Sequence, residues 1–175
     1  MSTIDNYHIV REVISHHFRT KGIITSFLPK IDGYGSGCHF HLSLWKNGKN
    51  VIGDPTSRLG VSPDAESFIA GILNNYEALF HFLCPSPNSI RRMLPSKWVG
   101  VYKCWGVENK EAPIRLCSSS KASEKFSNFE IKSFDHTANH YFALAAIIAL
   151  GMNGIRNHMK LPEPINEDPA DLSED

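Results

Sequence analysis

The sequence has few cysteines and no excess of charge of either sign, and each shortage excludes a class of protein. The 175 residues include four cysteines, none of them in a C-x-x-C pair. We therefore predict that all four are reduced and that they form no disulfide framework or structural zinc site. The 18 basic and 18 acidic side chains balance, and no Lys/Arg cluster provides the basic surface of a nucleic-acid-binding protein.

Long apolar runs are also missing. The longest one, residues 142–150, is about half of the ~20 residues that a membrane-spanning helix needs. The first residues lack the basic start and apolar core of a secretory signal. We therefore predict a cytoplasmic globular chain that binds neither nucleic acid nor a membrane.

Helical and strand-like segments alternate along the sequence. Helical periodicity covers residues 9–18, 62–83 and 141–157. Strand-like patterns cover residues 23–28, 38–45, 51–52, 99–105, 114–117 and 129–134, with an Asn-Gly hairpin signal at 47–48 and a Ser/Lys-rich loop over 118–127. The order predicts an α+β fold in which a mainly antiparallel sheet has its helices on one side.

Two histidines on the strand 38–45 are the first candidate ligands. Alternation along this strand places His39, His41 and Ser43 on one face. Two imidazoles at this spacing can approach the same ion, although such a pair is also common on plain sheet surfaces. A zinc hydrolase is one alternative, and it requires a third protein ligand.

Charged side chains on later segments provide further candidates. Glu130 and Lys132 share one strand face, and such a pair suits either a site for a cation and an anionic substrate or a surface ion pair. Arg91 and Arg92 lie on a proline-bounded loop, and Arg115 lies in a strand. Together these arginines could flank a phosphate or a carboxylate.

Taken in order, these motifs resemble the C-terminal half of the glutamine synthetase catalytic domain, which has a guanido-kinase-like fold. The resemblance runs through residues 35–45, 88–95, 108–115 and 128–135 to the Ala-rich helix. In detail the chain resembles the type I-like glutamine synthetase-like proteins of plants and fungi, some of which are fused to an amidohydrolase-like domain. The resemblance implies a partial catalytic domain over residues 1–160 and a truncated, acidic, proline-containing tail over 161–175.

The resemblance also implies a function. It identifies the chain as a fragment of an ATP-dependent ligase that joins glutamate to ammonia or an organic amine through γ-glutamyl phosphate. Such a ligase uses Mg²⁺ or Mn²⁺, forms a homo-oligomer and serves glutamine biosynthesis. We expect the isolated fragment to be inactive; the alternative is a non-catalytic scaffold that binds nucleotide or another protein.

Several positions match the family's metal and nucleotide site. By this resemblance, His39 and Glu130 would ligate the metal. His41 and Ser43 would lie beside the nucleotide, and Gly35 would present its backbone to glutamate.

Positively charged positions match the family's substrate site, with departures. Arg92 would bind the glutamate carboxylate, and Arg115 would face the phosphates. Lys110 and Lys132 each stand where the family has an arginine near the phosphates, so the bidentate fork is lost. Trp98 stands where the family has the flap glutamate that deprotonates ammonium, and an indole cannot accept that proton.

Overall fold

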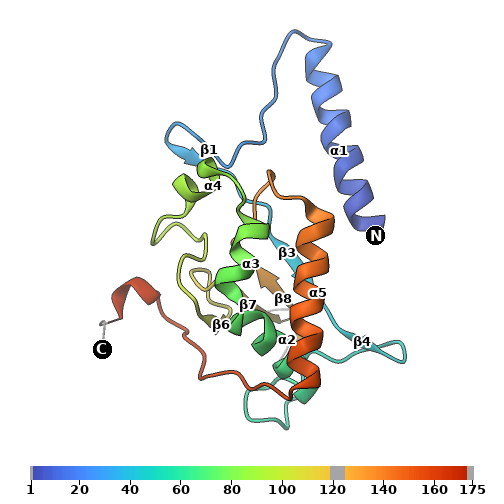
Figure 1. The fold of residues 1–175 in the computed structure, drawn as a ribbon, viewed down its shortest axis with the longest axis vertical. Coiled ribbons are helices and arrows are strands. Elements are labelled where there is room, and N and C mark those ends of the chain that lie inside the picture. The colour runs from blue at the N-terminus through green and yellow to red at the C-terminus, as the bar shows by residue number, and fades with distance from the viewer. Residues whose placement is uncertain (1, 119–124, 173–175) are drawn as a thin grey trace.

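A four-stranded sheet forms the centre of the computed structural model, which describes residues 2–118 and 125–172 (Figure 1). Its strands, in spatial order, are β3 (Phe40–Leu42), β8 (Phe126–Ile131), β7 (Ile114–Ser118) and β6 (Trp105–Val107). β8 pairs antiparallel with both of its neighbours, whereas β6 and β7 are parallel. The prediction of a mainly antiparallel sheet is confirmed.

The register of the strands concentrates polar side chains on one face. His41 and Arg115 both pair with Glu130, one from each neighbouring strand. Side chains of directly paired residues point to the same face of a sheet, as do side chains two residues apart. His39 and Lys132 therefore lie on this face too.

The opposite, apolar face of the sheet is covered by helices. They are α2 (Pro63–Asn74), α3 (Tyr76–Leu83) and α5 (His140–Arg156), which lie in front of the sheet in Figure 1. Ser62 caps α2 by accepting a hydrogen bond from the Ala65 amide, with Pro63 at the first helical position. The predicted single helix over 62–83 is wrong in one respect, because Asn75 separates α2 from α3.

Small residues bring α2 and α5 into backbone contact. A Cβ added to Gly154 of α5 would lie 2.0 Å from the Ser67 carbonyl oxygen and 2.8 Å from the Gly71 Cα. Gly151 faces the Phe68 ring in the same way. These helices pack at a spacing that only glycine permits.

The first helix, α1 (Ser2–Arg19), has the predicted amphipathic pattern, but its apolar side chains remain largely exposed. Ile4 is its buried residue. In Figure 1 most of α1 projects beyond the rest of the chain. The exposed apolar side chains of α1 are Ile9, Val10, Val13, Ile14 and Phe18.

Several predicted strand boundaries are wrong. Residues 23–28 and 99–104 form no strand, and β3 is shorter than the predicted segment 38–45. Two hairpins surround the sheet: β1 (Lys30–Ile31) with β2 (Tyr34–Gly35), and β4 (Trp45–Lys46) with β5 (Lys49–Asn50). The Asn47-Gly48 turn is confirmed, since both residues have positive φ, but the returning strand is 49–50 rather than 51–52. Of the predicted loop 118–127, residues 119–124 lie outside the described part of the chain.

The segment that follows α5 lies against the outer edge of β6. The Ile165 amide donates to the Trp105 carbonyl (2.9 Å), and the Trp105 indole donates to the Pro162 carbonyl (3.0 Å). Asn109 donates to the carbonyls of Ile165 and Glu167. Residues 162–167 are therefore packed against the sheet edge rather than free in solvent, and a short 3-10 helix follows (Pro169–Asp171).

Two further properties bear on the predictions from composition. All four cysteines are free, and three of them are buried. Within residues 2–118 and 125–172, no helix is long and apolar enough to cross a membrane.

A buried histidine at the start of α5 predicts pH-dependent stability. His140 is 1% exposed, and its burial, together with the nearby His8 and Arg11, lowers its pKa from 6.5 to about 4. The unfolded chain binds a proton at this residue between these two values and the folded chain does not. The stability that neutral His140 contributes is therefore complete above pH 6.5 and is lost as the pH falls towards about 4.

We expect urea unfolding to show a loss on the order of 2 kcal/mol between about pH 7.5 and pH 4.5 that depends on His140. His140→Leu should flatten this dependence, whereas His81→Leu, at an exposed position of α3, should preserve it. An equal pH dependence in wild type and His140→Leu would contradict the prediction.

Candidate active site

The carboxylate of Glu130, on β8, lies among four basic side chains. His41 belongs to β3 and Arg115 to β7, while His39 directly precedes β3 and Lys132 directly follows β8. Its Oε1 accepts a hydrogen bond from His39 Nδ1 (2.6 Å) and lies 3.7 Å from His41 Nε2. Its Oε2 lies 2.6 Å from Arg115 Nε and 3.5 Å from Lys132 Nζ. The contact with Arg115 is an ion pair without hydrogen-bond geometry, because neither Arg115 Nε nor Glu130 Oε2 has a hydrogen-bond partner. We call these five residues the Glu130 cluster.

The positive charges in this cluster keep the buried carboxylate ionised. Burial is the largest single influence and raises the pKa of Glu130, but the His39 hydrogen bond and the charges of Lys132 and Arg115 together outweigh it. The resulting pKa is about 2. Burial also lowers the pKa of Lys132, an effect that Glu130 partly offsets.

His39 and Glu130, which are far apart in the sequence, lie side by side in the structure. This proximity was predicted, and the 2.6 Å contact confirms it. An imidazole and a carboxylate are both ligands for divalent metals. In the described part of the chain no group of three His, Cys, Asp or Glu side chains could hold a metal, so the zinc-hydrolase alternative has no third ligand there.

A cavity of about 450 Å³ adjoins the cluster through His39. Arg92 lines it and is 3% exposed; its Nη2 donates to the Phe134 carbonyl (3.1 Å). No carboxylate pairs with this guanidinium among the described residues. A Cβ on Gly37 would lie 2.9 Å from Arg92 Nη1, so the glycine leaves room for the arginine. A buried cation that faces a cavity and has no carboxylate partner favours an anionic ligand.

A short helix that we did not predict positions Arg92. This helix is α4 (Pro87–Arg92), and Ser86 and Ser89 form a capping box at its start. Asn88 both accepts from and donates to the Lys30 backbone, which fixes α4 against β1. The sequence prediction placed a proline-bounded loop here because the segment is shorter than one heptad.

Other predicted site residues lie apart from the cluster or at its rim. Ser43 accepts a hydrogen bond from the Trp45 indole (2.8 Å), and Lys110 lies over the Trp98 ring, 5.4 Å from its centroid. His41 is exposed, and its Nδ1 lies 2.8 Å from Asn128 Oδ1. Gly35 lines the cavity together with Arg92 and Trp98. Their roles toward a nucleotide or glutamate remain predictions.

Sequence analysis missed two cationic residues that line the cavity and one residue that positions the Trp98 segment. Lys30 and Lys97 line the cavity, and Glu111 accepts a hydrogen bond from the Trp98 amide at 3.1 Å. No motif marks Lys30 or Lys97, and Glu111 lies within the motif 108–115 without having been assigned a role. Trp98 has a positive φ of 56°, and the Glu111 contact holds it in this uncommon conformation.

Comparison with known proteins identifies the family. The family model for the glutamine synthetase catalytic domain matches residues 1–175. A gamma-glutamylpolyamine synthetase, GlnA3 of Streptomyces coelicolor, is 39% identical over 98% of this chain and 38% of its own length. Type-1 glutamine synthetase 1 of Dictyostelium discoideum is 42% identical over 94% of this chain and 34% of its own length.

A solved structure has the same fold. The structure titled "Apo GmaS without ligand" aligns with a TM-score of 0.79 at 26% identity, over 94% of this chain and 37% of that one. The chain thus spans between about a third and two fifths of the length of these relatives. On this evidence the chain belongs to the glutamine synthetase family and corresponds to part of its catalytic domain.

Proposed function

We propose that this chain contributes part of the active site of an ATP-dependent ligase that joins the γ-carboxyl of glutamate to ammonia or an organic amine through γ-glutamyl phosphate. The observation that supports this most directly is the ionised Glu130 beside His39, adjoining a cavity in which buried Arg92 has no carboxylate partner within residues 2–118 and 125–172. Such a reaction brings together several phosphate and carboxylate oxygens, whose charge cations must neutralise.

The basic residues then bind different parts of the substrates. Arg92 binds the glutamate carboxylate in the cavity, and Arg115 and Lys132 face the phosphates. Lys132 is 4% exposed, so its charge acts in a poorly hydrated environment, where electrostatic effects are stronger than in water. Gly35 offers its backbone to glutamate, and His41, Ser43 and Lys110 contact the nucleotide.

His39 and Glu130 would hold a divalent ion, Mg²⁺ or Mn²⁺, which when bound neutralises phosphate charge. Such an ion prefers about six ligands, mostly oxygens, and the described residues provide two. We therefore propose that the other ligands come from the part of the catalytic domain that the relatives have and this chain does not span. We also propose that the protein is cytoplasmic and forms a homo-oligomer. Within this chain, we propose a partial catalytic domain over 1–160 that is followed by a short acidic tail.

Trp98 favours an organic amine as the acceptor. It lines the cavity, is 61% exposed and replaces the flap glutamate that the family resemblance predicts. An aromatic ring can contact an alkyl amine and attract its charge. One relative is named for a polyamine product.

From the sequence motifs we also propose a closer kinship with the glutamine synthetase-like proteins of plants and fungi.

A non-catalytic scaffold is the second candidate. Trp98 supports it because it cannot replace a catalytic base, and Lys110 and Lys132 support it because they lack the arginine fork. The two functions differ in metal dependence. A scaffold that retains a nucleotide site binds ATP without a divalent ion.

Calorimetric titration of the chain with ATP, with Mn²⁺ or with excess chelator, tests the proposal. We expect binding that requires Mn²⁺ and weakens at least ~10-fold in His39→Ala and in Glu130→Gln, because each removes one ligand. His81→Ala, on the exposed face of α3, is the control and should bind like wild type. Binding that ignores the metal, or that survives both site variants, would favour the scaffold.

A further inference from the structure

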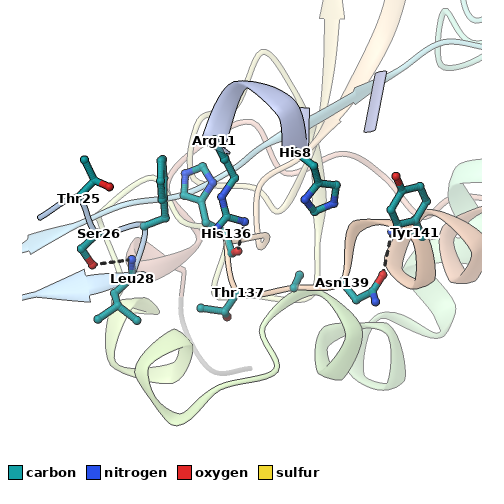
Figure 2. A pocket seen from close by; sticks show the side chains of 11 residues that line it. His8, Arg11, Thr25, Ser26, Leu28, His136, Thr137, Asn139 and Tyr141 are labelled. Carbon is teal, nitrogen blue, oxygen red and sulfur yellow. Dashed lines mark hydrogen bonds between the residues drawn. The ribbon is translucent and has the colours of Figure 1, made fainter. Parts of the chain in front are cut away.

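A second cavity, of about 680 Å³, lies between α1 and the segment that precedes α5. Figure 2 shows His8 and Arg11 pointing from α1 toward the Thr137–Asn139 segment. Residues 25–28 form another wall. None of its lining residues lines the cavity beside the Glu130 cluster, so the proposed ligase function does not account for it.

The lining of this second cavity carries positive charge and no carboxylate. Arg11 is its charged residue, with the imidazoles of His8 and His136 beside it, and no Asp or Glu lines it. Two acidic residues contact lining residues: Asp5 accepts from the Tyr141 hydroxyl, and Oδ1 of Asp135 accepts from the Thr137 amide and hydroxyl.

The Arg11 guanidinium has more N–H donors than its hydrogen bonds use. Its Nη1 donates to the His136 carbonyl (2.9 Å) and to the Tyr7 hydroxyl (3.3 Å). A guanidinium has five N–H donors, and within the described ranges Arg11 forms no ion pair and makes no other hydrogen bond. Its guanidinium also lies over the Phe27 ring, 4.7 Å from the centroid. Arg11 is thus held in place while part of its fork remains available.

The surrounding groups are fixed and include further donors. The Tyr7 ring is stacked on His136, and the Tyr7 hydroxyl lies 2.6 Å from His136 Nδ1. Ser26 Oγ accepts from the Leu28 amide, which leaves its hydroxyl hydrogen free to donate. Burial, followed by the charge of Arg11, lowers the pKa of His136. The charge of Asp135 only partly offsets these two influences.

We propose that this cavity is a binding site for the oxyanion group, phosphate or carboxylate, of a small molecule, with Arg11 as its principal ligand. An Arg fork matches either oxyanion, and neighbouring hydroxyl and imidazole groups complete its hydrogen bonding. Ser26 donates from the rim, and His8 and His136 flank the anion.

Titration of the full chain with inorganic phosphate and, separately, with citrate tests this proposal. The imidazole NMR signals of His8 and His136 report occupancy, with chloride at matched ionic strength as the reference. We expect a saturable shift of these signals with at least one of the two anions, and the preferred anion identifies the oxyanion. A shift that merely follows ionic strength, or no saturable shift with either anion, would overturn the proposal.

Two pairs of variants separate binding from folding. Arg11→Gln should weaken binding about tenfold, whereas Arg19→Gln, at an exposed position of the same helix, should not. Because Arg11 also donates a hydrogen bond to the His136 carbonyl, its replacement affects the fold as well as the site. The second pair of variants therefore changes Ser26, which is exposed, and leaves the buried residues unchanged. Ser26→Glu places a negative charge at the exposed rim, and Ser26→Gln is its uncharged match. Equal affinity in the two Ser26 variants would also overturn the proposal.

Discussion

Glu130→Ala is expected to lower the free energy of unfolding by about 3–5 kcal/mol, because it removes one partner from a buried ion cluster. Lys132 is 4% exposed, and its Nζ lies 3.5 Å from the Glu130 carboxylate. Nε of Arg115, on the neighbouring strand β7, lies 2.6 Å from the same carboxylate. Without the carboxylate, two positive charges face each other in a poorly hydrated site. Urea denaturation at neutral pH measures the loss.

A double variant tests whether the loss comes from unpaired charge rather than from a cavity. Glu130→Leu combined with Lys132→Met removes a buried charge of each sign, and we expect it to recover much of the stability that Glu130→Leu loses. Asp64→Ala breaks the exposed pair between Asp64 and Lys46 and should cost less than about 1 kcal/mol. If Glu130→Ala costs no more than Asp64→Ala, the cluster is hydrated and our description of its electrostatics is wrong.

Gly154→Ala is expected to destabilise the fold by about 1–3 kcal/mol or more, although alanine favours a helix over glycine. The added methyl would collide with the Ser67 carbonyl, 2.0 Å away, and with the backbone of Gly71. These are backbone atoms, which move only if α2 and α5 separate. Thermal unfolding measures the effect.

Gly33→Ala makes the same chemical change where no atom lies within 4 Å of the new methyl. We expect it to leave the melting temperature nearly unchanged. A Gly154→Ala variant as stable as wild type would show that the two helices can separate at little cost.

The sequence was informative where a local pattern decides the structure. Alternation in β3 correctly placed His39 and His41 on the face opposite Phe40 and Leu42. Alternation along residues 128–132 likewise placed Glu130 and Lys132 on one face. These patterns predicted the two pairs because side-chain direction follows from strand geometry, whereas the meeting of His39 with Glu130 was predicted from the family resemblance alone.

Features that depend on tertiary contacts could not be predicted in this way. Residues 99–104 have strand-like side chains but find no strand partner, and Gly100 there adopts a positive φ of 71°. Asn75, which divides α2 from α3, is not a strong helix breaker. The environment of Arg92 depends on Gly37 and Phe134, neither of which is adjacent to it in sequence, so its burial could not be derived from its own segment.

The two margins of the central sheet differ. Along β6, residues 162–166 already occupy the outer hydrogen-bonding positions, and the Ile165 carbonyl oxygen would lie 2.1 Å from a Cβ on Gly106. Within the described ranges β3 has a strand partner only on its β8 side. Any strand that enlarges this sheet therefore has to join next to β3. The side chains that such a strand turns toward the Glu130 face would then lie beside His39 and His41, where the proposed divalent ion would take its additional oxygen ligands.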